Sequence, residues 1–305
     1  MKNKIGLYVI IVIIFTALVA GASYFAYRYF SDNSAKKPLT ASQPLFTAAT
    51  MPKLDGSTVA IPFMDGVYAD CLGVDIKDIN YEYSTTQPSY LKLIDKEVDV
   101  IIVTEPSADA LKYAEKKGVE LEVTKIITDG FVFFVNKQNT ITSLTIDEIR
   151  SIYSGEVTNW SELGGNDAKI IAYQRPINSG SQTGMLSLVM KELKMKKPKT
   201  EEVIETMVGI IDWVSNYTGE AHGIGYSYYY YANDMYISDD IKFLAINNIL
   251  PNFETIQTET YPLMTAYYMV SRKGETDPNV NKLKEVILSE HGKEIAVATG
   301  YIPVK

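Results

Sequence analysis

The sequence predicts an α/β protein in which helices cover mostly parallel sheets. After residue 52, short apolar runs rich in β-branched residues alternate with segments of helical spacing. The clearest run is Val98–Val103, VDVIIV, which is typical of a strand buried on both faces. Such alternation is the pattern of α/β layers. At 305 residues, the chain is long enough for one large domain or two smaller ones.

Composition narrows the classes of function. The net charge of −8 argues against a nucleic-acid partner, although a small anion can still bind in a pocket of local dipoles. The single cysteine, Cys71, excludes an internal disulfide and a cysteine-based metal cluster. With only two histidines, a histidine-ligated metal or a Ser–His–Asp triad is not expected. We therefore expect no metal, no cofactor and no catalytic residues.

Residues 1–30 predict a signal anchor or transmembrane helix. Residues 5–27 carry no charge, and a helix of about 20 residues crosses a bilayer. The segment Ala20-Gly21-Ala22 resembles a signal cleavage site, but the apolar run is longer than a usual signal core, which favours an uncleaved anchor. Residues 31–51 are polar and turn-rich, so they predict a tether to a body that begins near Pro52.

Within the body, spacing and turn residues predict each element in turn. The expected helices run from the turn at Asp55–Thr58 through Val67, from Thr85 through Lys96, and over Ala108–Lys117, Thr145–Tyr153 and Met185–Leu193. The expected strands are Tyr81–Ser84, Val98–Val103, Leu121–Ile127, Gly130–Val135 and Ile170–Tyr173. The tyrosine run 226–231 predicts a strand and helix packed at a lobe surface, in preference to a platform for stacking bases or sugars.

The stretch YQRPINSGSQTG, residues 173–184, predicts a strand end, a turn and the start of a helix. Small residues at a helix N-terminus leave backbone N–H groups free where the helix dipole is positive, and such a site holds an anion. Arg175 adds donors suited to phosphate or carboxylate oxygens. The alternative is an ordinary helix cap beside a solvated arginine.

Four turns between strands and helices carry side chains suited to an oxyanion. In open α/β sheets, ligands bind at the carboxyl ends of strands, which is where these turns are expected. Each turn alone is better explained as a helix cap, but four together favour a binding site. The turns are Ser57-Thr58, Thr86, Thr104-Glu105, and Arg175 with Ser179-Gly180-Ser181.

Glu105 follows the apolar strand, where a carboxylate is either paired or functional. It could cap the next helix or pair with Lys112. Alternatively, it accepts a hydrogen bond from a protonated ligand oxygen or pairs with Arg175. A carboxylate that accepts a proton from phosphate would repel fully ionised sulfate, which gives selectivity. We favour the functional alternative.

From about Pro52 to its end, the chain resembles the phosphate-binding proteins of bacterial phosphate ABC importers, which have the type II periplasmic-binding-protein fold. The segment LTIDEIRSIYSGEVTNWSELGG (144–165), followed by YQRPINSGSQTG, carries most of this resemblance. The segments GIGYSYYYY (223–231) and HGKEIAVATGYIPV (291–304) support it. The order of the segments is that of the family.

The resemblance implies two α/β lobes that close on a ligand by a hinge. Crossover strands are then expected near Gly130–Val135 and Tyr261–Val270. Lobe 1 would comprise residues 52–130 and 265–305, and lobe 2 residues 131–264.

The resemblance also implies the residues that bind phosphate. Thr58, with its neighbours Ser57 and Val59, matches the first phosphate-contacting turn, Thr86 a helix-capping serine, and Glu105 a binding aspartate. Arg175, Ser179, Gly180 and Ser181 match the contacts of the second lobe. Glu replaces Asp at 105, and Ile177 stands where an acidic residue usually follows the arginine.

The expected function is the capture of inorganic phosphate or a closely related oxyanion, without catalysis. The expected partners are ABC permease subunits and, through the N-terminal helix, the extracytoplasmic face of a bacterial membrane; alternatively, the chain is secreted after cleavage. Another function remains open, since a permanent tether is unusual for a diffusing carrier: a membrane-anchored sensory or adhesive module with the same fold.

Overall fold

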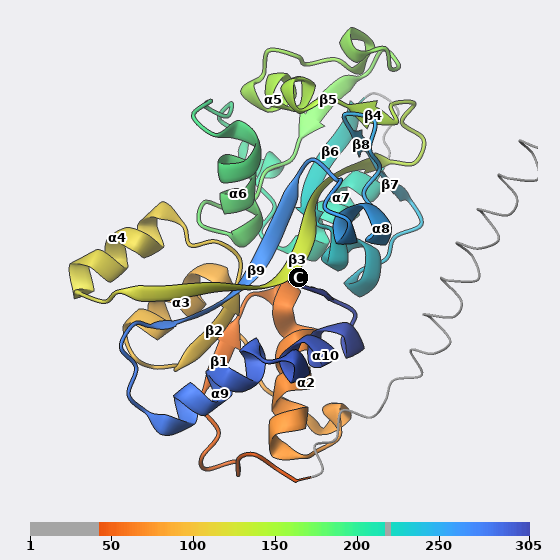
Figure 1. Ribbon diagram of the computed structural model, residues 1–305. Coiled ribbons are helices and arrows are strands. Elements are labelled where there is room, and N and C mark those ends of the chain that lie inside the picture. Colours follow the sequence, from red (N-terminus) through yellow and green to blue (C-terminus); the bar gives the residue numbers. More distant parts are fainter. Residues whose placement is uncertain (1–42, 217–220) are drawn as a thin grey trace, which may run out of the picture. The chain divides into compact units, whose positions relative to one another are not determined.

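Strand β3, Leu121–Asn136, joins two groups of secondary structure (Figure 1). Its first part pairs antiparallel with β9, Met264–Arg272, in one sheet. Its last part pairs antiparallel with β6, Ala221–Tyr228, in a second sheet. The computed structural model describes residues 43–216 and 221–305. We call the elements on the first sheet lobe 1 and those on the second lobe 2.

Lobe 1 has the strand order β1-β2-β9-β3, with the short β10, Ile302–Pro303, also paired to β3. Strand β1, Leu54–Gly56, runs parallel to β2, Val100–Val103, whereas β2 and β9 are antiparallel. The core is apolar and includes Leu93, Ile101 and Val270. The helices are α2 (Ile61–Leu72), α3 (Thr86–Ile94), α4 (Ala108–Lys117), α9 (Pro278–Leu288) and α10 (Glu290–Ala298).

In lobe 2, β5 (Lys169–Ala172) is parallel to β6, and β7 (Ile241–Phe243) pairs with the end of β3. Strands β4 (Ser143–Leu144) and β8 (Ala245–Ile246) form a separate parallel pair. Fully buried rings of Phe131, Phe133 and Tyr226 pack against one another in the core. The helices are α5 (Ile146–Ser154), α6 (Gly180–Gly184), α7 (Met207–Ser215) and α8 (Phe253–Gln257), and α6 continues as a π-helix over Met185–Met190.

Where local sequence signals were strong, the helices begin where they were expected. Helix α4 has the predicted bounds, since the Ser107 hydroxyl accepts from the N–H of Ala110 and Gly118 ends the helix at φ 67°. Helix α5 begins after Thr145, which forms a capping box with Glu148. These signals act within a few residues and need no tertiary partner.

The predicted mostly parallel sheet is wrong. Strand β9 lies between β2 and β3 in the sheet of lobe 1 and is antiparallel to both. Antiparallel pairs therefore dominate that sheet. The two strands predicted over Leu121–Ile127 and Gly130–Val135 are one continuous strand, with a register shift between Lys125 and Ile127. The long crossover therefore passes through Asp129-Gly130 without a break.

Two shorter predictions also differ from the structure. No strand forms at Tyr81–Ser84, where the Tyr81 ring instead stacks on that of Tyr68, with centroids 4.1 Å apart. The turn expected at Asp55–Thr58 is partly the strand β1. At the end of the predicted tether, the N–H groups of Leu45 and Phe46 donate to the carbonyl of Cys71, so these residues lie on the folded body.

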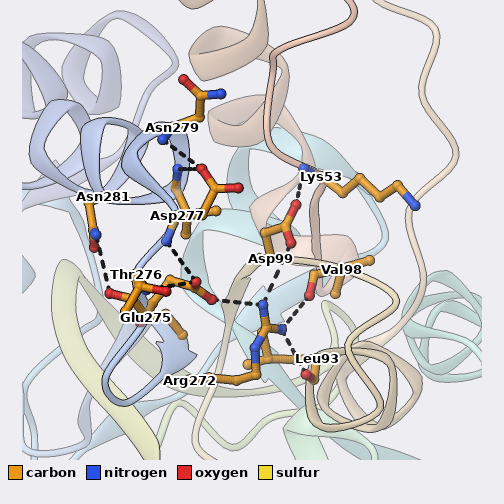
Figure 2. Close-up of polar contacts among 12 residues, drawn as sticks. Lys53, Leu93, Val98, Asp99, Arg272, Glu275, Thr276, Asp277, Asn279 and Asn281 are labelled. Atoms are coloured by element: carbon orange, nitrogen blue, oxygen red, sulfur yellow. Dashed lines mark hydrogen bonds and ion pairs between the residues drawn. The ribbon is translucent and has the colours of Figure 1, made fainter.

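The end of β9 is fixed by a partly buried arginine (Figure 2). One terminal nitrogen of Arg272 donates to the carbonyls of Leu93 and Val98, at 3.0 and 2.7 Å. The other lies 2.9 Å from the Glu275 carboxylate and 3.6 Å from that of Asp99. This network ties the β9–α9 connection to the α3–β2 connection of lobe 1.

The predicted N-terminal membrane helix lies outside the described residues. Among the residues that are described, none of the helices combines the length and apolar character needed to span a bilayer.

Candidate functional site

A cavity of about 410 Å³ lies between the two lobes. Four helix N-termini open onto it, two from lobe 1 and two from lobe 2. Eight of the nine predicted ligand-binding residues line this cavity: Ser57, Thr58, Val59, Thr86, Arg175, Ser179, Gly180 and Ser181. The structure thus brings together turns that are more than a hundred residues apart in the sequence.

The lobe 1 side of the cavity presents uncapped backbone. Ser57 precedes the short 3₁₀ turn Thr58–Ala60, and Thr85 precedes α3, yet neither side chain caps its helix. The first N–H groups of these helices lack intrahelical partners, as at every helix start. The Ser57 side-chain oxygen is also buried and has no hydrogen-bond partner among the described residues. A buried polar group in this state requires an explanation, and a bound ligand oxygen supplies one.

Arg175 lies on the lobe 2 side and is only 8% exposed. Its Nε donates to the carbonyl of Ile204 at 2.7 Å, and its terminal nitrogens donate to the Glu205 carbonyl at 2.9 Å and to the Ser181 hydroxyl at 3.4 Å. Two of the five guanidinium N–H donors have no partner among the described residues. Burial lowers the pKa of Arg175 from its usual value, because the cation is desolvated.

The predicted anion-binding stretch forms the start of α6. Ser179 is the N-cap, and its hydroxyl accepts from the N–H of Gln182. The preceding Asn178 adopts a left-handed conformation, with φ 69°, which directs the chain into the helix. Ser179 therefore acts as a helix cap while the stretch also lines the cavity, but the arginine beside it is buried, contrary to the solvated arginine of the cap alternative.

The lobes touch at the floor of the cavity. A Cβ atom added at Gly180 would lie 2.4 Å from the Thr104 hydroxyl and 2.7 Å from that of Thr86. Only glycine fits this approach of the α6 backbone to lobe 1. Nearby, the Asn178 amide donates to the Asp109 carboxylate at 2.9 Å, and the Ser187 hydroxyl donates to the Glu105 carboxylate at 3.0 Å.

Glu105 does not line the cavity, and the predicted pairing with Arg175 is absent. Its carboxylate accepts from Ser187 and, at 3.4 Å, from the hydroxyl of Tyr268 on β9. The α4 cap proposed for it is provided by Ser107. Glu105 instead makes one of the contacts between the lobes.

The tyrosines of the 226–231 run were missed as part of the site. Tyr226 and Tyr228 are fully buried on β6, contrary to the predicted surface position. The Tyr226 hydroxyl accepts from the backbone N–H of Arg175 at 3.0 Å, and the Tyr228 hydroxyl donates to the Gly180 carbonyl at 2.9 Å. Tyr228 and Tyr231 line the cavity. The spacing of two between Tyr226 and Tyr228 was the available signal that both face the same side of a strand.

Converging N–H groups, hydroxyls and one buried guanidinium are the chemistry that can hold a small anion. Among the residues that the structure describes, Glu205 is the only acidic one that lines the cavity, and it is exposed. Among residues 43–216 and 221–305, no cluster of His, Cys, Asp and Glu side chains is arranged to hold a metal ion.

Comparisons with known proteins agree with this geometry. A family model described as a PBP superfamily domain matches residues 47–292. The phosphate-binding protein PstS of Bacillus subtilis is 28% identical over 194 residues, which are 62% of this chain and 61% of that protein. PstS of Borreliella burgdorferi is 27% identical over 207 residues, or 65% of this chain and 71% of that protein. The matched part thus spans about three fifths of the B. subtilis relative.

Among solved structures, a phosphate ABC transporter substrate-binding protein of Clostridium perfringens with bound phosphate matches with a TM-score of 0.62. The match covers 83% of this chain and 98% of that one at 21% identity, which shows the two-lobed α/β fold. These matches confirm the predicted resemblance to bacterial phosphate-binding proteins, and the chain belongs to the PBP superfamily.

Proposed function

We propose that the protein is an extracytoplasmic solute-binding protein that captures inorganic phosphate, or a closely related oxyanion, for an ABC importer. The observation that carries this proposal is the buried Arg175 guanidinium beside uncapped helix starts, with no carboxylate of the described residues as its partner. A buried cation is costly unless it is paired, and a bound oxyanion would pair it. The relatives named above are phosphate-binding proteins.

The proposed ligand contacts are the eight predicted residues that line the cavity, from Ser57 to Ser181. The proposed lobe boundaries are those expected from the sequence: residues 52–130 and 265–305, and residues 131–264. The proposal involves no catalytic residue. The N-terminal segment is proposed to hold the protein at the membrane, and ABC permease subunits to receive the ligand.

Titration calorimetry of the full chain with phosphate and with sulfate tests the proposal. We expect heat of binding with phosphate. Arg175→Ala should weaken binding at least a hundredfold, because two hydrogen bonds from a charged donor contribute roughly 1.5–3 kcal/mol each. Arg150→Ala is the matched control, since Arg150 bonds to Asp147 and the Val189 carbonyl outside the cavity.

Arg175 also holds two backbone carbonyls, so its variant could unfold. Ser57→Ala avoids this problem, because the Ser57 hydroxyl has no partner to lose among the described residues. We expect weaker phosphate binding by Ser57→Ala at an unchanged melting temperature. A folded wild-type protein that gives no heat with phosphate or sulfate would refute the proposal.

A second function, sensing or adhesion with the same fold, is favoured by the uncharged run of residues 5–27. A permanent tether suits a receptor as well as a carrier. Phosphate uptake by cells that lack this chain separates the two functions. A loss of uptake supports transport, whereas normal uptake supports the second function.

A further inference from the structure

We propose that the cavity takes a phosphate group that carries a small apolar substituent, such as a phosphate monoester, in preference to inorganic phosphate. This inference rests on the proposed function, because it uses the same oxyanion site at the floor of the cavity. It adds a second part to the ligand, which would lie against an apolar wall.

The first observation is the size of the cavity. Its volume of about 410 Å³ falls within the range of roughly 300–1,000 Å³ that is typical of pockets for organic ligands. A water molecule takes about 30 Å³ of liquid, and an ion of five heavy atoms needs on the order of a few such volumes. Inorganic phosphate would therefore leave most of the cavity unfilled.

The lobes are already in contact on one side of this volume. At the floor, Gly180 already lies so close to the Thr86 and Thr104 hydroxyls that one added carbon would clash. Two hydrogen bonds also cross between the lobes, from Asn178 to Asp109 and from Ser187 to Glu105. Further closure at these points is blocked, so the space remains when the lobes are in contact.

The second observation is the chemistry of the cavity wall. The polar groups come from the helix starts and Arg175, whereas Pro176, Ile177, Met207 and Val208 contribute apolar side chains. Ile177 is 77% exposed, although an acidic residue was expected at this position from the resemblance. Burying apolar surface contributes roughly 25 cal/mol per Å², so a substituent that covers this wall would add affinity.

The third observation is the scarcity of carboxylate acceptors, which leaves hydroxyls such as that of Ser57 to accept. Inorganic phosphate retains at least one P–OH donor near neutral pH, and this donor needs an acceptor. The predicted acceptor, Glu105, lies outside the cavity, and the remaining carboxylate, Glu205, is exposed. A phosphate monoester has a second pKa near 6, so at pH 8 it is a dianion without a P–OH donor. The backbone N–H groups and Arg175 only donate, and the hydroxyls can donate too, so the site fits this ester dianion better.

Titration calorimetry of the full chain at pH 8, with inorganic phosphate, methyl phosphate and phenyl phosphate as probes, tests the inference. We expect at least one ester to bind about tenfold more tightly than inorganic phosphate. If phosphate binds and both esters bind equally or more weakly, the inference is refuted and the proposed function stands. If none of the three binds to the folded protein, both are refuted.

Variants of the wall give an independent test. Ile177→Ser and Val208→Ser should each lower the ratio of ester affinity to phosphate affinity at least threefold, because the substituent loses apolar contact. Ile237→Ser is the matched control, since Ile237 is 73% exposed and lies outside the cavity lining, and it should leave the ratio unchanged. A ratio that both wall variants leave at the wild-type value would overturn the inference.

Discussion

Replacement of Gly180 by alanine tests whether contact between the lobes is needed for binding. The new Cβ would lie 2.4 Å from the Thr104 hydroxyl, and ordinary contact requires about 3.4 Å. A rotation of Thr104 alone does not clear the space, because the Thr86 hydroxyl lies 2.7 Å from the same position. Both threonines are buried. We therefore expect the α6 backbone to move about 1 Å away from lobe 1.

The size of the effect follows from the hydrogen bonds between the lobes. The Asn178–Asp109 and Ser187–Glu105 bonds are 2.9 and 3.0 Å long, and a shift of about 1 Å along them would exceed the usual limit near 3.2 Å. A net hydrogen bond contributes about 0.5–1.5 kcal/mol. Loss of both would weaken binding by about 1–3 kcal/mol, or roughly 5- to 150-fold.

Calorimetry of the Gly180→Ala variant with phosphate measures this loss, with Thr104→Ala and the double variant completing a cycle. The double variant removes the 2.4 Å clash, so it should bind more tightly than the two single effects predict when added together. Wild-type affinity in Gly180→Ala would show that the lobes do not approach here in the bound state, and the reasoning would fail.

Three further predictions concern stability. Arg272→Met should lower the free energy of unfolding by about 1.5–3 kcal/mol in urea, since it removes hydrogen bonds from a charged donor to the Leu93 and Val98 carbonyls and to the partly exposed Glu275 carboxylate, and leave phosphate affinity unchanged. Burial raises the pKa of Asp129 to about 7. The contribution of Asp129 to stability is therefore present at low pH and lost as the pH rises from about 4 to 7. Asp129→Asn should reduce the slope of the free energy of unfolding against pH over that range, measured in urea, by up to about 1.4 kcal/mol per pH unit. A hydrogen bond to Asp70 raises the pKa of His291, so His291→Gln should lower the melting temperature more at pH 5.5 than at pH 8.5; equal losses would contradict this.

The sequence predicted those parts of the fold that depend on neighbouring residues. Helices α4 and α5 carry their own caps, so that their starts can be found without tertiary information. Strand β1 has only three residues and exists because it pairs with β2, more than forty residues away. Tyr81–Ser84 has strand-forming residues but no strand partner among the described residues. Propensity is a weak guide when distant pairing decides the outcome.

The crossover strand shows how a buried polar group alters such a prediction. The sequence Thr128-Asp129-Gly130 is typical of a turn, and it lies where the two predicted strands meet. In the structure, the Asp129 carboxylate accepts from the N–H groups of Gly130 and Tyr230 and from the Tyr267 hydroxyl. These partners satisfy the carboxylate within the protein, so the strand continues through a position where aspartate would otherwise end it.

The lining of the cavity was predicted where backbone chemistry determined it and missed where side chains from distant elements did. Each helix start could be recognised from its small and hydroxyl-bearing residues. The direction of the Glu105 side chain could not, because it depends on Ser187 from lobe 2 and Tyr268 from β9. The supporting hydroxyls of Tyr226 and Tyr228 likewise required knowledge that β6 lies beneath Arg175 and Gly180.

The position of Glu105 changes what Arg175 implies. If Glu105 neutralised the guanidinium, an anion would have to displace a carboxylate in order to bind. Instead, Arg175 is surrounded by carbonyls and a hydroxyl, which solvate the cation without cancelling its charge. The cost of burying that charge is carried by the unliganded protein, and an oxyanion would relieve it. Ligand at a hundred times its dissociation constant should then raise the free energy of unfolding by about 2.7 kcal/mol. Only in the folded state is the Arg175 guanidinium buried without a carboxylate partner. The stabilisation by ligand should therefore depend on Arg175 and be retained in the Arg150→Ala variant.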